Sequence, residues 1–250
     1  ITDNKYKYPY LLKSSKGAPL FSIAAFFGSK KCYDYLVGDE TDIPEFMISP
    51  LAYACAGGNM YFVHDIFSRF QEKVYNPREI YNLSCGYLSI FFGHFDVVKW
   101  LFLKGYEFSN ADIREAFKCG YEDIAYFFLE NKEAFGNEIS HSYLDLVNDT
   151  CEGGNEKLLQ NLLTKYPHEK FTKKAYQNFI NSSISQGNIS CVKCLINNSQ
   201  SFFPRSYGSF IQPSFLYASC HDYLDIIVYL IRLGAKIDDN EAKYSPLILA

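Results

Sequence analysis

Residues 89–101, with the sequence SIFFGHFDVVKWL, decide the fold. They place a small residue four positions before a glycine, and apolar residues four, five and eight positions after it. Offsets of four, five and eight share one face of a helix with 3.6 residues per turn. The stretch therefore predicts that Gly93 opens an amphipathic helix with one buried face.

The same pattern recurs along the chain at intervals of 27 to 35 residues. The glycine position is occupied by Gly28, Gly58, Gly93, Gly120, Gly154, Gly187 and Asp222. The residue four positions earlier is always small: Ala24, Ala54, Ser89, Ala116, Thr150, Ser183 and Ala218. All 21 residues at the three later offsets are apolar. A repeat of this period predicts a row of similar supersecondary units.

Each unit is expected to hold two helices. Apolar residues seven positions before the glycine, such as Leu51, share a helical face with the small residue, so a first helix precedes the turn. Glycine suits the left-handed residue that ends a helix. One such pair cannot bury its apolar face alone, whereas a stack can. We therefore expect an all-α repeat protein, an α-solenoid. Extended fingers or hairpins are expected in the linkers 38–49, 105–111, 166–174, 197–209 and 234–245.

These residues resemble the ankyrin repeat. Residues 49–59, SPLAYACAGGN, are similar to its Thr-Pro-Leu-His-x-Ala-Ala-x-x-Gly-His segment, and residues 93–101 are close to its second-helix consensus. Residues 224–230 continue the second-helix pattern, and residues 245–250 open a further unit. The Phe-, Tyr- and Asn-rich style resembles divergent ankyrin proteins expanded in some protists. Tetratricopeptide units have a similar period, but their Trp-x-x-Leu-Gly pattern is absent.

The resemblance covers about residues 17–250. It implies about seven ankyrin repeats and a truncated eighth, with residues 1–16 as an N-terminal cap or partial repeat. Two features depart from the family pattern: most units lack its proline, and Asp222 stands where glycine is expected. The missing initiator methionine and the interrupted unit at Ala250 predict that the chain is a piece of a longer protein.

Composition narrows the functional classes. The chain has 250 residues, of which 48% are hydrophobic and 21% charged, which is typical of a globular protein. A formal net charge of −4 argues against nucleic acid or an anionic membrane as partner, because phosphate neutralisation needs clustered cations. No stretch reads as a membrane span. Eight cysteines in this length are too sparse for a disulfide framework, which predicts a reduced, cytoplasmic location.

Motifs for catalysis or metal binding are weak. Cys191 and Cys194 form a Cys-x-x-Cys pair that could be half of a zinc or redox site, but no second pair accompanies it. Cys191 also falls in an apolar repeat position, so packing is the favoured interpretation. His94 occupies the position where the ankyrin family often has a turn-stabilising histidine. We predict no enzyme activity, no cofactor and no metal site.

The resemblance implies that a protein partner binds on the concave face, through finger tips and the ends of the first helices. At helix ends the candidates are Phe26, Phe27, Phe91 and Phe92; in fingers they are Phe46, Tyr81, Phe108 and Phe210. In other units the helix-end positions hold Lys118, Cys119, Ser185, Gln186, Cys220 and His221. The alternative is that these aromatic residues pack between neighbouring units.

The sequence thus predicts a monomeric, non-catalytic protein-interaction module that acts as an adaptor or scaffold. One alternative is the targeting arm of a larger enzyme, such as a kinase or ubiquitin ligase, whose catalytic domain lies outside this segment. Another is a passive structural spacer.

Overall fold

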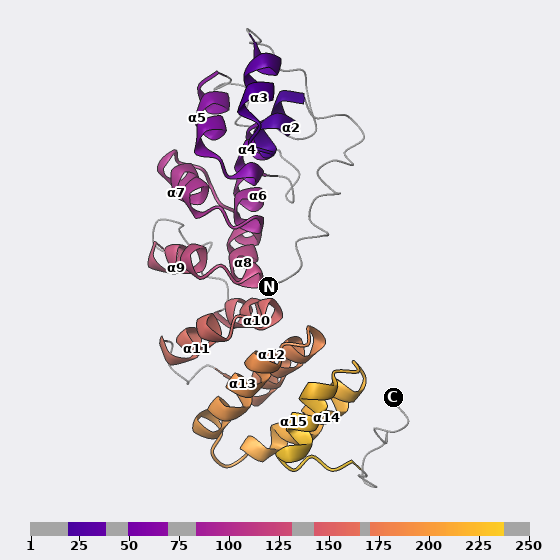
Figure 1. The fold of residues 1–250 in the computed structure, drawn as a ribbon. Coiled ribbons are helices and arrows are strands. Elements are labelled where there is room, and N and C mark those ends of the chain that lie inside the picture. The colour runs from indigo at the N-terminus through magenta and orange to yellow at the C-terminus, as the bar shows by residue number, and fades with distance from the viewer. Residues whose placement is uncertain (1–19, 39–49, 70–83, 132–142, 166–170, 238–250) are drawn as a thin grey trace. The chain divides into compact units, whose positions relative to one another are not determined.

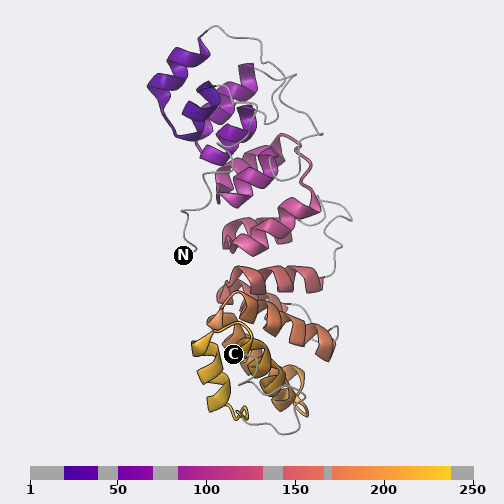
Figure 2. The same cartoon turned by 90° about the vertical axis from the view of Figure 1, so that its right-hand side faces the viewer.

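The computed structural model describes residues 20–38, 50–69, 84–131, 143–165 and 171–237, and within them every regular element is a helix. The helices follow one another as seven pairs, each with a first and a second helix (Figures 1 and 2). The pairs are α2 (Leu20–Phe26) with α3 (Lys30–Val37), α4 (Pro50–Gly57) with α5 (Met60–Arg69), α6 (Cys85–Phe91) with α7 (Phe95–Leu103), α8 (Asn110–Cys119) with α9 (Glu122–Glu130), α10 (Tyr143–Gly153) with α11 (Glu156–Lys165), α12 (Lys173–Ser185) with α13 (Ile189–Phe202), and α14 (Ile211–Ser219) with α15 (Leu224–Arg232). The short helix η5 (Tyr207–Phe210) precedes α14.

The chain divides into two compact units, residues 1–116 with 126–135, and residues 117–125 with 136–250. The division passes through α8 and α9. The predicted boundary at residue 16 and the predicted eighth repeat lie outside the described residues.

The turns confirm the repeat register. The six glycines at the repeat position have φ angles between 68° and 78°, and Asp222 has φ of 57°. In three of these turns the residue after the glycine donates its amide to the carbonyl of the small residue four positions before the glycine: Ser29 to Ala24, His94 to Ser89, and Asn188 to Ser183, each at 2.8 Å. This is the Schellman closure of a helix, which requires a left-handed residue at the glycine position.

Asp222 is the non-glycine residue that the described backbone holds at positive φ. Aspartate tolerates this region better than most residues, but its Cβ still costs energy there. We expect Asp222→Gly to raise the free energy of unfolding by about 0.5–1 kcal/mol, measured by urea unfolding. Asp222→Ala is the matched variant and should lower stability, because alanine cannot use a polar side chain to support the turn. If both variants matched the native protein, the turn would not be strained.

In the first unit, first helix packs on first helix, α2 against α4 and α4 against α6, while the second helix α5 packs against α7. The small column lies inside these contacts: Ala24 is 7% exposed, and Ala54, Ser89 and Ala116 are fully buried. The buried side of each second helix carries the predicted apolar columns, for example Phe62, Val63 and Ile66 of α5. In the first described pair, Cys32 is exposed although its column is otherwise buried.

In the second unit, α10 packs against α12 and α12 against α14, and the second helices α11, α13 and α15 pack in the same order. Thr150, Ser183 and Ala218 of the small column are fully buried. Tyr176 lies at the centre of an aromatic core and donates its hydroxyl to the Leu195 carbonyl at 2.8 Å. Its ring is 5.2 to 6.2 Å from the rings of Phe171, Phe179, Phe202, Phe203 and Phe210.

One linker prediction was wrong. Residues 197–209 were expected to leave the helix at Asn197, but α13 continues to Phe202. The polar residues there bond back to the helix, since Asn198 donates to the Cys194 carbonyl and Ser199 to that of Ile196. Phe202 at the end packs on Phe171, 5.6 Å between ring centroids. Aromatic packing thus extends the helix through a polar stretch.

Neighbouring pairs are joined by one recurring hydrogen bond. The residue directly after the glycine position reaches back with its side chain to a carbonyl at the end of the preceding first helix. The bonds are His94 Nε2 to Ala56 (2.9 Å), Asn155 to Gly120 (2.8 Å), Asn188 to Cys151 and Glu152 (both 3.1 Å), and Tyr223 to Ser185 (3.2 Å). Because a carbonyl only accepts, Nε2 of His94 carries the hydrogen. Burial lowers the pKa of His94, so its imidazole is neutral at pH 7.

Candidate functional site

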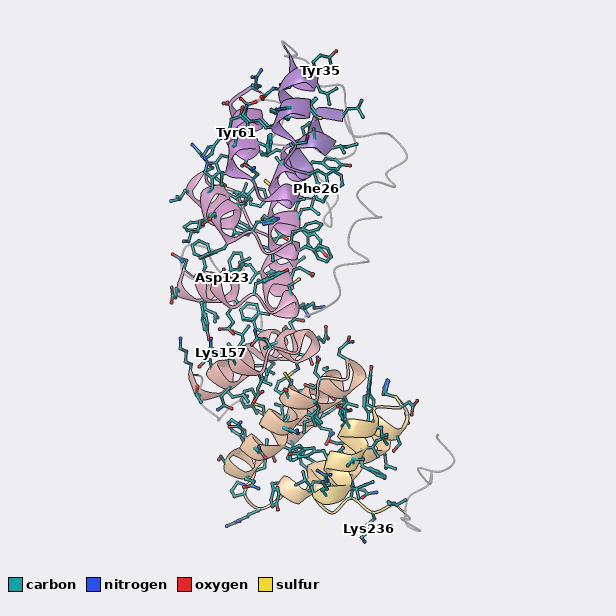
Figure 3. All side chains as sticks on the ribbon, in the orientation of Figure 1. Phe26, Tyr35, Tyr61, Asp123, Lys157 and Lys236 are labelled. Atoms are coloured by element: carbon teal, nitrogen blue, oxygen red, sulfur yellow. The ribbon has the colours of Figure 1, made fainter. Side chains whose placement is uncertain are left out.

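Four of the predicted aromatic residues come together at the ends of α2 and α6. We call Phe26, Phe27, Tyr87, Phe91 and Phe92 the aromatic cluster; Figure 3 labels Phe26. Ring centroids are 4.9 Å apart for Phe26 and Phe27, 5.7 Å for Phe26 and Phe92, and 5.3 Å for Phe91 and Phe92. Tyr87 stacks on Phe91 at 5.7 Å. The first three contacts are edge-to-face, which is a favourable geometry for aromatic rings.

The cluster forms because α4, the first helix that lies between α2 and α6 in the sequence of pairs, ends in small residues. Ala56 and Gly57 hold the positions in α4 that correspond to Phe26 and Phe27 in α2 and to Phe91 and Phe92 in α6. A Cβ at Gly57 would lie 2.6 Å from the Phe26 carbonyl oxygen, so side chains are excluded there. The absence of a side chain at Gly57 leaves room for Phe26 and Phe92 to meet across α4.

The cluster is partly open to solvent. Phe27 is 59% exposed, while Phe26, Phe91 and Phe92 are half-buried. Large apolar side chains with this exposure are typical anchors for a protein partner, since their remaining area can still be removed from water. The same aromatic residues therefore pack between neighbouring repeats and still keep part of their area exposed to solvent.

Two other candidates are not available to a partner. Phe108 is 5% exposed and packs against Phe128, 5.2 Å between ring centroids. Phe210 is fully buried, 5.4 Å from Tyr176. Both were placed at finger positions, with packing between units as the alternative, and both rings are buried. Phe46 and Tyr81 lie outside the described residues.

In the second unit the equivalent helix-end positions are mainly polar. Lys118 forms ion pairs with Glu152 at 3.2 Å and with the buried Asp149 at 3.7 Å. Ser185 and Gln186 follow in α12 and at its end, and Cys220 and His221 after α14. The aromatic character of the first-helix ends thus belongs to the first unit.

The Cys-x-x-Cys pair has the properties of packed core residues. Cys191 and Cys194 are buried in α13, and burial raises the pKa of their thiols to about 12 and about 11. Thiols with such values remain protonated at pH 7 and are poor nucleophiles and metal ligands. Among the described residues no three His, Cys, Asp or Glu side chains are grouped so that they could hold a metal ion.

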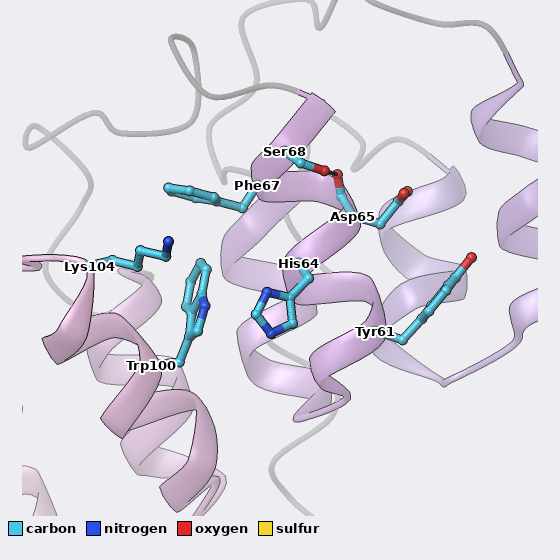
Figure 4. A pocket seen from close by; sticks show the side chains of 7 residues that line it. All are labelled: Tyr61, His64, Asp65, Phe67, Ser68, Trp100 and Lys104. Carbon is cyan, nitrogen blue, oxygen red and sulfur yellow. Dashed lines mark hydrogen bonds between the residues drawn. The ribbon is translucent and has the colours of Figure 1, made fainter.

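A pocket that no sequence pattern predicted lies between the second helices α5 and α7 (Figure 4). It is lined by Tyr61, His64, Asp65, Phe67, Ser68, Trp100 and Lys104. Asp65 and Trp100 both lie seven residues after their repeat glycine, outside the predicted apolar columns, and the other lining residues fall at other offsets. The usable signal was Trp100, the single tryptophan of the chain, which falls outside the core columns.

Paired helices in sequence order, left-handed turns at the repeat glycines and a buried small column define a helical repeat protein. The structure is similar to the crystal structure of the human ASB11 ankyrin repeat domain, with a TM-score of 0.56 and 18% sequence identity over 81% of this chain and 91% of that chain. The chain therefore has the ankyrin repeat fold, as predicted. No protein-family model matches the sequence, and no curated protein matches it.

None of the described helices combines the length and the apolar character that a bilayer-spanning helix needs.

Proposed function

We propose that the protein is a non-catalytic adaptor or scaffold that binds a protein partner on the concave, first-helix face of its ankyrin repeats. The observation that carries this proposal is the aromatic cluster, in which Phe27 keeps 59% of its area exposed. Phe26, Phe91 and Phe92 surround it with half-buried rings. Aromatic anchors of this kind contribute much of the binding energy in protein interfaces.

The net charge, the cysteines and the fold also support a protein partner. The net charge of −4 offers no electrostatic attraction to nucleic acid. All eight cysteines are free thiols, which fits a monomer in the reducing cytoplasm. The ankyrin fold itself supplies a rigid scaffold, while the residues at the helix ends vary and set specificity.

The test is affinity capture with the native chain and with the double variant Phe27→Ala/Phe91→Ala. We expect the double variant to lose partners that the native chain retains, because it removes two anchors from one surface. Truncation of a single interface anchor typically weakens binding by about 2 kcal/mol or more. Binding constants for each retained partner should be measured with purified protein.

Tyr35→Ala is the matched control. Tyr35 is 87% exposed on α3 and contributes no ring to the aromatic cluster (Figure 3). The Tyr35→Ala substitution removes a comparable exposed ring from the same unit and should leave the set of bound partners unchanged. Equal partner lists for the native chain and the double variant would refute the proposed surface and favour a passive spacer.

A further inference from the structure

The pocket between α5 and α7 has the dimensions of a ligand site. Its volume is about 550 Å³, which is within the range of volumes found for ligand pockets. It lies on the second helices, whereas the aromatic cluster lies at the ends of the first helices. In Figure 4, Phe67, Trp100 and Lys104 gather on one side of the pocket, and Tyr61 and Asp65 on the other.

One wall of the pocket is aromatic. The Trp100 ring is 5.0 Å from Phe67 and 5.3 Å from His64, measured between centroids, and both contacts are edge-to-face. Trp100 is 8% exposed, so its ring is held firmly between the helices. A fixed aromatic wall favours an apolar or aromatic side chain as the occupant.

The acidic group of the pocket is already neutralised. The Asp65 carboxylate accepts a hydrogen bond from the Tyr33 hydroxyl at 2.7 Å and pairs with Arg69 Nε at 2.8 Å. The charge of Arg69 offsets that of Asp65, which leaves little net attraction for a cationic ligand. Asp65 therefore supports the local structure and does not select the ligand.

The basic group that lines the pocket is Lys104. Lys104 has no carboxylate partner among the described residues, and its Nζ lies 5.6 Å from the Phe67 centroid and 6.0 Å from that of Trp100. An ammonium over aromatic rings is held weakly at an exposed site. A carboxylate that enters can thus engage Lys104 without breaking an existing ion pair.

We propose that this pocket binds an acidic segment of a partner protein, with a carboxylate on Lys104 and a neighbouring apolar side chain against Trp100 and Phe67. Among the residues that the structure describes, Lys104 is the one lysine or arginine that lines the pocket, which matches one carboxylate, and the aromatic wall matches its apolar neighbour. The pocket is a second interaction site, separate from the aromatic cluster. Each proposal can fail without the other, because Phe27→Ala/Phe91→Ala leaves every residue of this pocket in place.

The test uses two capped tripeptides, acetyl-Leu-Glu-Phe-amide and its neutral isostere acetyl-Leu-Gln-Phe-amide. Trp100 is the single tryptophan of the chain, so its fluorescence reports on this pocket alone. We expect a saturable change with both peptides and about fivefold tighter binding of the glutamate peptide, which is the upper range for one exposed ion pair. Added salt should reduce that preference. Equal affinities, or no saturable change, would overturn the proposal.

Lys104→Met keeps the length of the side chain and removes its charge, and it should bind both peptides equally. Lys104→Arg should restore the preference for glutamate. Lys99→Met is the matched control, because Lys99 lies over Phe95 at 4.1 Å on the same helix and does not line the pocket. If Lys99→Met abolished the preference, or Lys104→Met kept it, the assignment to Lys104 would be wrong. A response to acetate as strong as that to the peptide would reduce the pocket to a general anion site and overturn the peptide-segment assignment.

Discussion

Gly153→Ala should lower the free energy of unfolding by about 2–3 kcal/mol. Gly153 is the last residue of α10, where this helix approaches the end of α8. A Cβ there would lie 2.3 Å from the Lys118 carbonyl oxygen and 2.8 Å from that of Phe117. Both neighbours are backbone atoms, so a helix must move to admit one methyl group. The change is measured by urea unfolding followed by circular dichroism.

Gly208→Ala is the control for this prediction. Gly208 belongs to the same unit, and a Cβ there meets no atom within 4 Å. The two variants make the same chemical change and differ in the space available. Alanine is favoured over glycine in helices by about 1 kcal/mol, so intrinsic propensity alone predicts stabilisation at Gly153. If Gly153→Ala were as stable as the native chain, the close approach of α10 to α8 would be disproved.

Ala54→Trp should also destabilise the first unit, by at least about 1–3 kcal/mol. Ala54 is fully buried in α4, which packs between α2 and α6. An indole at this position must separate the first helices from each other. The loss should appear in urea unfolding and in early amide exchange of α4 and its neighbours.

The matched substitution is Ala111→Trp at the start of α8, where the alanine is exposed. It adds the same side chain to a helix without filling a buried contact, and its stability should stay close to that of the native chain. A neutral result for Ala54→Trp, or equal losses for both, would undermine the repeat register.

The repeat pattern predicted the fold because its columns report packing. The small residues Ala116 and Ala218 were expected in tight helix contacts, and both are fully buried. The glycine column was expected in left-handed turns, and even Asp222 adopts that conformation. The end of α13 was less predictable. The polar composition of residues 197–201 does not indicate that Phe202 packs on the ring of Phe171.

The candidate site was predictable only in part. Helix-end positions led to Phe26, Phe27, Phe91 and Phe92, but the pattern could not show that Gly57 lets them meet across a neighbouring helix. It also could not decide whether aromatic residues near the linkers are exposed or pack in the core, as Phe108 and Phe210 do. The pocket around Trp100 joins residues of two repeats that lie outside the predicted apolar columns, and such a site depends on three-dimensional placement.

The side chains that reach back from one turn to the previous one are a histidine, two asparagines and a tyrosine. Any donor of suitable reach satisfies the same carbonyl, so substitution at this position is tolerated as long as a hydrogen is offered. Different residues can therefore occupy this position of the repeat while the hydrogen bond between neighbouring pairs is kept. The same fold is therefore compatible with a sequence identity as low as 18%.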